Sequence, residues 1–407
     1  MFIGQLLLTL YDFYFASLGF PIVPVFGAVL FVTATLMLPR PQRAESARKR
    51  HRTILLGLLL GFLFFVSALW GLAAFKSATI KGPAGISFGI LLYCVTMLQE
   101  DNVEYKEYLF RFLNVILALH LFAWILQFLS FTFFHNFLDY LKPVTGIPSR
   151  HGAPMEELVT KISRYTGLFA EPAAYVTFIF MGITARMIRN DLKLKLFDGL
   201  LIASMALSLA ITGYFLILIC LVFWASTVLR TPRAWSILAV LLGVLIVYGS
   251  TQMDSPYLKI IVLRLATPSS DASVKVRTTN AFESYNDLPE SGQIFGAGFG
   301  NYALTENVSN GLLNLFIFLG VLGAPIISGL FIWLLRLRRF PWMVWLFLFA
   351  TLPFAPPFTL QNWWLWIALM VLFGQDRIRA REAYTVESAL PHPGSNPITP
   401  GAITPQH

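Results

Sequence analysis

Charged residues are scarce in this sequence. Asp, Glu, Lys and Arg make up 13% of its 407 residues, whereas a typical soluble domain carries about 25%. Hydrophobic residues reach 57%, and the mean hydropathy is +0.68. A water-soluble protein of this size cannot bury so much apolar surface, so the excess must face lipid. The composition excludes a soluble enzyme, a nucleic-acid-binding domain and a secreted disulfide scaffold.

Cysteine is almost absent, and the N-terminal region has no basic residue. Cys94 and Cys220 both lie inside long apolar runs, which favours packing residues over a disulfide or a metal pair. No Lys or Arg precedes Arg40, so the first 38 residues lack the basic start of a cleavable signal peptide. We predict that these residues form permanent membrane helices.

Long apolar runs fill most of the remaining chain and predict an all-α polytopic membrane protein with about 12 transmembrane helices. The expected helices lie near residues 1–18, 20–38, 54–75, 84–98, 109–130, 172–188, 196–211, 213–229, 235–250, 311–334, 342–356 and 358–373.

The distribution of Lys and Arg predicts the orientation. Of the 30 basic residues, 20 fall in one set of connections, mostly short loops such as 39–53 and 186–195, and 10 in the other set. Cytoplasmic loops are enriched in Lys and Arg, so we place the first set and both termini in the cytoplasm. The net charge of +9 is thereby mainly a topology signal and gives no reason to expect nucleic acid as a partner.

The sequence divides into a membrane domain and a tail. Residues 1–383 are predicted to form one integral membrane domain. Residues 384–407 contain five prolines and few apolar residues, which predicts a disordered cytoplasmic tail.

Two long loops, 131–171 and 251–310, are predicted on the outer face, where we expect the chemistry. In the first, FTFFHNFLDYL predicts an interfacial amphipathic helix and MEELVTKISRY a short helix with Arg164 near its end. Glu171–Pro172 then marks the start of a membrane helix. The second contains the apolar stretch YLKIIVLRLA, which would hold Arg264 at the membrane surface. Its GAGFG run is weak evidence for a phosphate cradle, and a tight turn is favoured.

Three motifs together resemble the bacterial O-antigen polymerases. They are RYTGLFAEP (164–172), IFGAGFGNY (294–302) and SNGLLNLFIFLGVLGAP (309–325). This family belongs with the O-antigen ligases among membrane glycosyltransferases that use lipid-carried sugars. The resemblance implies about twelve helices and two large periplasmic loops whose arginines hold a polyprenyl diphosphate. The related ligases commonly have a His-Asn pair where this chain has Ser309–Asn310, which favours a polymerase.

By resemblance, Arg164 in the first loop and Arg264 or Arg277 in the second match the arginines that hold the diphosphate. Arg164, Arg264 and Glu171 are the candidate catalytic residues. The candidate substrate-binding residues are Arg277, Lys259, Tyr285 and Asn310.

The chemistry of glycan transfer independently requires cationic residues such as these arginines. Glycan transfer from a polyprenyl diphosphate releases a multiply charged leaving group, which either a metal or fixed cations must stabilise. The outer loops contain no Asp-x-Asp pair, and arginine can bind phosphate through two hydrogen bonds. We therefore expect a site with neither metal nor cofactor.

Each candidate has a structural alternative. The arginines could be interfacial residues whose side chains snorkel to lipid headgroups, and Glu171 could simply cap a helix. His135 and His151 are more typical of loop-surface residues, whereas His120 and Asp12, within apolar helices, should face the bundle interior.

Three functions remain open from the sequence. The first is a polymerase of the bacterial inner membrane that joins undecaprenyl-diphosphate-linked repeat units on the periplasmic face, with a chain-length regulator as a possible partner. The second is an O-antigen ligase acting on lipid A-core. The third is a lipid-linked glycan flippase or transporter. The position of the charged residues at helix ends and the two long outer loops argue against this third function.

Overall fold

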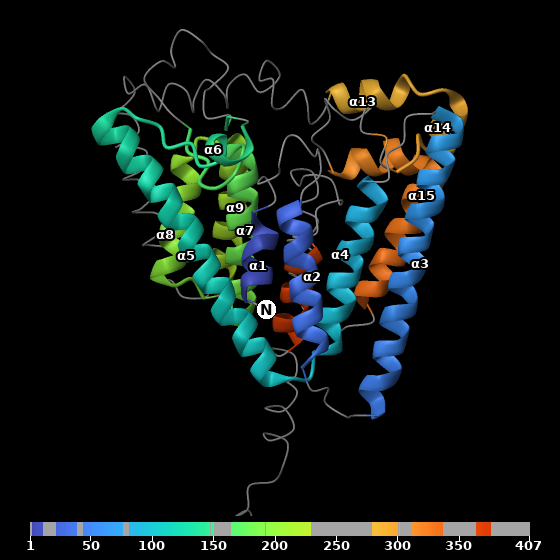
Figure 1. The fold of residues 1–407 in the computed structure, drawn as a ribbon, viewed down its shortest axis with the longest axis horizontal. Helices are drawn as coiled ribbons and strands as arrows, with labels where there is room; N and C mark the ends of the chain where they lie inside the picture. Colours follow the sequence, from blue (N-terminus) through green and yellow to red (C-terminus); the bar gives the residue numbers. More distant parts are fainter. Residues whose placement is uncertain are drawn as a thin grey trace, which may run out of the picture.

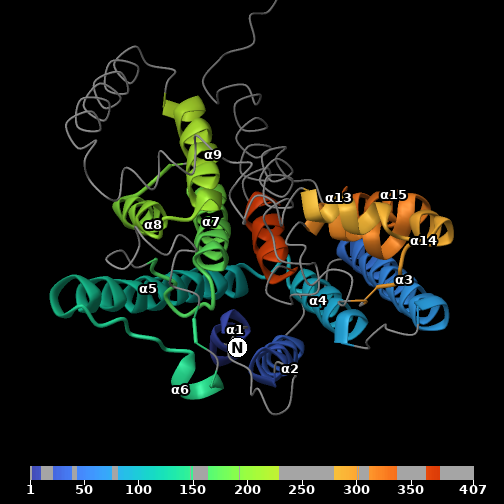
Figure 2. The ribbon, with the colours of Figure 1, turned by 90° about the horizontal axis from the view of Figure 1, so that it is seen from above.

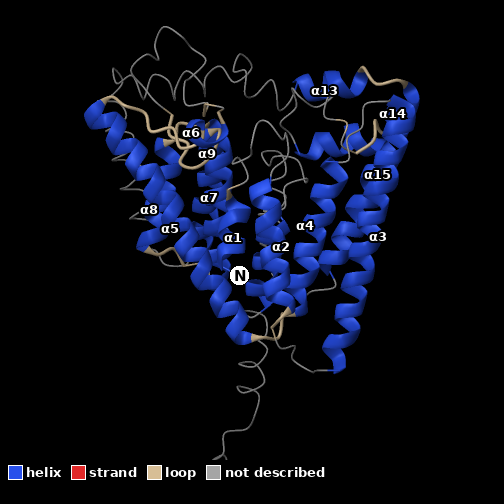
Figure 3. Ribbon diagram, viewed as in Figure 1, coloured by secondary structure: helices blue, strands red, loops and turns tan. Residues whose placement is uncertain are grey.

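A computed structural model describes residues 2–10, 22–38, 44–75, 81–146, 148–149, 164–191, 193–228, 279–299, 301, 311–336 and 364–375. Across these ranges the chain forms helices and connecting turns, with no strand (Figure 3). The helices are α1 (Phe2–Thr9), α2 (Ile22–Leu36), α3 (Ala44–Phe75), α4 (Lys81–Leu98), α5 (Val103–Phe134), α6 (Lys142–Thr145), α7 (Pro172–Arg189), α8 (Leu196–Leu207), α9 (Ile211–Val228), α13 (Thr279–Asn286), α14 (Glu290–Phe295), α15 (Gly311–Arg336) and an unlabelled helix, Trp364–Gln375.

Three of these helices are long and apolar enough to cross a membrane. The candidate spans are His51–Phe75 in α3, Val103–Phe134 in α5 and Gly311–Leu334 in α15, and several shorter apolar helices accompany them. The predicted all-helical class is thus confirmed for the described residues, and three helices with the length and apolar character of membrane spans are compatible with a membrane protein. The predicted helices 235–250 and 342–356 and the tail 384–407 lie outside the described residues.

Helix Trp364–Gln375 lies at the centre of the bundle (Figure 2). All of its residues are buried, as expected for a helix that is apolar on every side. Its aromatic contacts, with ring centroids 5.2–6.4 Å apart, are Trp364–Tyr93 with α4, Trp364–Phe331 with α15, Trp366–Phe178 with α7 and Phe373–Phe110 with α5. This helix therefore joins the α3–α4–α15 flank of the bundle to the α5–α7 flank.

The predicted interfacial helix over FTFFHNFLDYL is wrong. Instead, α5 continues through Phe134 and ends at His135, whose left-handed backbone (φ 52°) stops it, and a non-helical stretch leads to α6. The apolar FTFF segment extends α5 to 32 residues, about 48 Å long at 1.5 Å per residue. That length exceeds the roughly 30 Å hydrocarbon core of a bilayer, so α5 must tilt or project beyond it.

Both predicted outer loops contain short helices at the same end of the molecule. Loop 131–171 contributes α6, and loop 251–310 contributes α13 and α14 (Figure 1). The helix predicted at MEELVTKISRY falls almost wholly on residues 151–163, outside the described part. At the far end of α7, Arg186 pairs with Asp198 at 2.5 Å and Arg189 pairs with Glu107.

We expect a topology reporter to place the end of the molecule that carries α6, α13 and α14 on the opposite side of the membrane from the C-terminal end of α7. A reporter fused after Arg43 or Arg379 should read cytoplasmic, and one fused near Ser149 or Ser284 periplasmic, because Lys and Arg concentrate on the first side. Activity of alkaline phosphatase, which folds only outside the cytoplasm, is the measurement. A periplasmic signal at Arg379 would contradict the orientation.

Candidate functional site

The segment Arg164–Glu171 forms a non-helical connection that enters the bundle between α5 and α7. The side-chain amide of Gln127, on α5, binds the backbone of this segment at Thr166 and Gly167 and also the backbone of Leu138. Nε2 donates to the carbonyls of Leu138 (2.8 Å) and Gly167 (3.1 Å). Oε1 accepts from the N–H groups of Thr166 (3.1 Å) and Gly167 (2.8 Å). All four hydrogen-bonding positions of this amide are therefore used.

The segment reaches well below the outer end of α5. Gln127 lies seven residues before Phe134, and His120 fourteen residues before it, or about 10 and 21 Å along the helix. Phe169 stacks on the imidazole of His120 with ring centroids 5.0 Å apart. Non-helical backbone at membrane depth is tolerated only where protein or a cavity satisfies its polar groups. Gln127 meets that requirement here.

Aromatic packing fixes the side chains of the same segment. Tyr165 and Phe169 are almost completely buried, at 1% and 0% exposed. Their ring contacts are Tyr165 with Trp124, Phe128 and Phe131, and Phe169 with His120, Phe178 and Tyr175. The prediction that His120 faces the interior is confirmed, since it is fully buried between Phe169 and Phe178.

Two further hydrogen bonds tie this region to α8. The Tyr175 hydroxyl lies 2.8 Å from Ser204 Oγ, and the Trp124 indole N–H donates to Ser208 Oγ at 2.9 Å. Buried Tyr and Trp side chains commonly need such partners for their polar atoms. The helices α5 and α7, which contact the Arg164–Glu171 segment, are thus tied to α8.

We expect Gly167→Ala to destabilise the protein more than Gly146→Ala. Both glycines have a left-handed backbone, with φ of 57° and 74°. An added Cβ at Gly167 would lie 3.1 Å from the Tyr175 ring, whereas at Gly146 it would meet nothing within 4 Å. Each alanine should cost about 1–2 kcal/mol of backbone strain, and crowding of Tyr175 should add about 1–3 kcal/mol at Gly167 alone.

Thermal unfolding of the two purified variants measures the difference. Equal losses would mean that Tyr175 moves aside without cost and that only the backbone conformation matters at Gly167.

Asp139 organises the part of the first loop that precedes this segment. Its carboxylate accepts backbone hydrogen bonds from Leu141 (3.0 Å), Lys142 (3.1 Å) and Ser149 (2.8 Å). Partial burial opposes ionisation, but these N–H donors outweigh it and hold the pKa of Asp139 below its ordinary value of 3.8. The Tyr140 hydroxyl, donating to the Ala123 carbonyl at 3.1 Å, anchors the same turn on α5.

Acid should therefore loosen this turn. Because the folded-state pKa of Asp139 is lowered, its stabilising contribution is complete above pH 3.8 and disappears as the pH falls through the lowered value. Asp139→Asn should lose that contribution at neutral pH. Hydrogen exchange of residues 139–149, compared between wild type and variant at each pH, tests this. The difference should vanish in acid, and a constant difference would contradict the assignment. Asp287→Asn, in the other outer loop, serves as the control.

In the second loop, Tyr285 connects the two short helices. Its hydroxyl donates to the carbonyl of Gln293 at 3.0 Å, which joins α13 to α14. The ring packs beside Phe75 and Leu313 against a small cluster of Leu288, Ala297 and Ile317.

The GAGFG run is a packing turn, as the sequence favoured. The N–H groups of Ala297 and Gly298 donate to the α15 carbonyls of Ile317 (2.8 Å) and Phe318 (3.1 Å). That of Phe299 donates to Ser67 Oγ at 3.1 Å. These amides are therefore already engaged and cannot cradle a phosphate. The glycines permit close backbone approach, since a Cβ at Gly298 would lie 2.1 Å from the Cα of Gly71.

The structure describes three of the seven candidate site residues. Arg164 is partly exposed at the start of the Arg164–Glu171 segment, and Glu171 ends the segment at the N-cap position of α7, where its side chain makes no capping hydrogen bond. Tyr285 lies on α13, in the second loop. Lys259, Arg264, Arg277 and Asn310 lie outside the described residues.

Sequence reasoning missed Gln127, although a signal for it was present. A lone amide within the apolar run FAWILQFLSF requires a polar partner inside a membrane helix. Which backbone it holds depends on a segment about forty residues away and is visible only in three dimensions. Cys94 and Cys220 are both buried and neither is in a disulfide, which agrees with the prediction of packing residues.

These observations define an all-helical chain with candidate membrane spans and a buried, non-helical segment bounded by an arginine and a glutamate. Comparison with family models, curated proteins and solved structures finds no match.

Proposed function

We propose that this chain is a polysaccharide polymerase of the bacterial inner membrane. It transfers a growing glycan from undecaprenyl diphosphate to the sugar hydroxyl of an incoming undecaprenyl-diphosphate-linked repeat unit, on the periplasmic face. The observation that carries the proposal is the fixing of the Arg164–Glu171 segment. Gln127 and the aromatic residues around it hold an arginine and a carboxylate at the two ends of one rigid connection.

The reaction places different demands on these two residues. The acceptor hydroxyl oxygen forms a bond to the anomeric carbon of the donor glycan, while the bond from that carbon to the diphosphate oxygen breaks. The lipid diphosphate leaves with its electron pair, and the hydroxyl proton passes to a base. Arg164 would stabilise the diphosphate charge through its fork of N–H donors. Glu171 is the candidate base.

A rigid support matters because electrostatic stabilisation is most effective when the donor is already in place. The segment following Arg164 has its backbone bound to α5 and its Tyr165 ring packed among three aromatic residues of the same helix. An arginine that only snorkels to lipid headgroups has no need of such an anchor. This contrast favours the catalytic interpretation of Arg164.

The surface glycan of a deletion strain tests the proposed function. Loss of a polymerase should leave a single repeat unit on the lipopolysaccharide core, whereas loss of a ligase should leave none. Purified protein in lipid vesicles should also extend a lipid-linked repeat unit in the presence of EDTA, because arginine replaces a metal. A core without any repeat unit would contradict the polymerase and favour the ligase. Loss of activity on chelation would contradict the metal-free site.

A further inference from the structure

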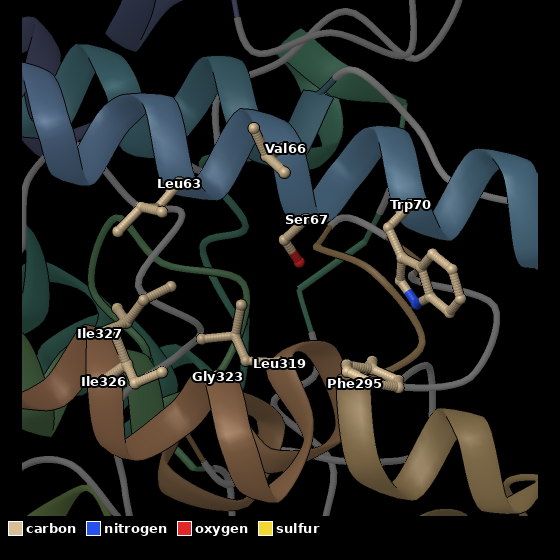
Figure 4. Close-up of a pocket in the computed structure, with 9 residues that line it drawn as sticks. All are labelled: Leu63, Val66, Ser67, Trp70, Phe295, Leu319, Gly323, Ile326 and Ile327. Atoms are coloured by element: carbon tan, nitrogen blue, oxygen red, sulfur yellow. The ribbon is translucent and has the colours of Figure 1, made fainter.

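An apolar groove runs between two candidate membrane spans, α3 and α15 (Figure 4). Its volume is about 390 Å³. One wall comes from α3 and the other from α15, and Phe295 of α14 closes one end. The lining residues are Leu63, Val66, Ser67, Trp70, Phe295, Leu319, Gly323, Ile326 and Ile327.

A break in α15 and a missing side chain create this space. Gly320 has a non-helical backbone (φ 66°, ψ −178°), so the helix changes direction there. A Cβ at this position would lie 2.2 Å from the carbonyl oxygen of Ile294, which shows how closely the end of α14 approaches the break. One turn further, Gly323 leaves the groove unfilled where any other residue would project a side chain.

The groove opens toward the surface that lipid would cover. Its floor is buried, with Leu319 at 3% exposed, while Ile326 on its rim is 59% exposed. Leu322 and Phe62, which lie beside it on the same two helices, are also more than half exposed. Because both helices are candidate membrane spans, this exposed apolar surface would face hydrocarbon in a bilayer.

The polar atoms of the groove are already hydrogen-bonded. Ser67 Oγ donates to the carbonyl of Phe318 at 3.4 Å and accepts from the N–H of Phe299 at 3.1 Å. The Trp70 indole N–H donates to the carbonyl of Gly296 at 3.1 Å. A sugar or a phosphate bound here would lose its hydration without gaining a hydrogen-bond donor, which is unfavourable. The lining suits a hydrocarbon chain.

We propose that this groove binds the polyisoprenyl chain of the lipid-linked substrate, an inference that rests on the proposed function. The closed end of the groove is formed by Phe295 and Trp70, whose rings meet edge to face at 5.8 Å. Phe295 is the last residue of α14, in the predicted outer loop 251–310, so a chain in the groove would end beside α14. The branched chain fills the space beside Gly323, and the diphosphate lies at the outer surface.

Photo-crosslinking of the full-length protein in nanodiscs tests this inference. The probe is a polyisoprenyl monophosphate carrying a diazirine on its chain. It should label peptides covering 63–70 and 319–327, and unlabelled undecaprenyl phosphate should compete. Gly323→Leu should reduce labelling roughly tenfold, which is about 1.4 kcal/mol or about two buried methylene groups. Gly329→Leu, where an added Cβ meets nothing within 4 Å, is the matched control and should label normally.

A second pair of variants tests the groove independently, in case the Gly323→Leu protein does not fold. Ile326→Trp fills the groove from its exposed rim, while Leu322→Trp adds the same ring to an exposed residue outside the groove. Only the first should lose labelling. If a diazirine phosphatidylglycerol labels the same peptides and undecaprenyl phosphate does not displace it, the groove holds ordinary bilayer lipid and the inference is overturned.

Binding and function can fail separately, because labelling needs no turnover. Specific labelling in a protein whose deletion leaves the surface glycan unchanged would support the groove and refute the polymerase. A shortened glycan in the deletion strain without specific labelling would support the polymerase and refute the groove.

Discussion

Gln127→Leu is expected to release the Arg164–Glu171 segment and to destabilise the protein strongly. Leucine has a similar size but removes the partner of four backbone groups, at Leu138, Thr166 and Gly167. Each buried group left without a hydrogen bond costs about 1–3 kcal/mol. Even if water reaches some of them, the loss should be about 3 kcal/mol or more, which is large beside the total stability of a domain. Thermal unfolding and limited proteolysis around residues 164–171 measure the effect.

The matched control is Ser130→Ala on the same helix. Ser130 Oγ makes one exposed hydrogen bond, to the carbonyl of Asn136 at 2.8 Å. Its loss should change the stability by about 0.5 kcal/mol or less, as for most surface substitutions. If Gln127→Leu unfolded at the wild-type temperature and resisted protease equally, aromatic packing alone would be sufficient to hold the segment.

Arg164→Ala is expected to nearly abolish polymerisation while the protein still inserts and accumulates. Removing one preorganised donor to a developing anion typically lowers the rate by about 10²–10³-fold. Lysine should restore only part of the activity, because a single point charge replaces a two-pronged contact with phosphate. Arg264→Ala should behave like Arg164→Ala, and Arg277→Ala should be intermediate. The measurement is glycan length in a complemented deletion strain, with membrane levels checked by immunoblot.

Arg150→Ala is the control for these variants. Arg150 lies in a Pro- and Gly-containing stretch of the sequence, directly between the polar residues Ser149 and His151, and should tolerate the change. Full-length glycan from both Arg164→Ala and Arg264→Ala at normal expression would refute the diphosphate-binding role. The arginines would then be interfacial residues.

Local patterns in the sequence predicted much of the helical framework. The apolar runs located α2, α4 and α7 to within a few residues, and the predicted helix 358–373 overlaps most of the central helix Trp364–Gln375. Glu171–Pro172 correctly marked the start of α7, because proline at the first turn suits a helix N-terminus. The prediction failed at the outer end of α5, where alternating aromatic residues resembled an amphipathic helix but the existing helix simply continued to Phe134.

The candidate site was only partly accessible from sequence. The motif RYTGLFAEP directed attention to the connection between α5 and α7 but gave no information about how deeply it is buried. Gln127 lies outside the motif, on another helix, and its role depends on a fold that brings residues 127 and 167 together. The GAGFG run had two possible interpretations until its N–H groups were seen to bond with α15.

The sequence by itself determined the all-helical class of the fold and predicted that some helices are long and apolar enough to span a membrane. Low charge and long apolar runs favour lipid contact, and hydrogen bonds within each helix satisfy the backbone there, so composition and pattern suffice for that prediction. Only the tertiary structure shows how the polar groups of the non-helical backbone between those helices are hydrogen-bonded. These groups need partners from elsewhere in the chain, which Gln127 supplies to residues 166–167 and α15 to residues 297–298. Such pairings depend on which helices pack side by side, and no local pattern encodes that.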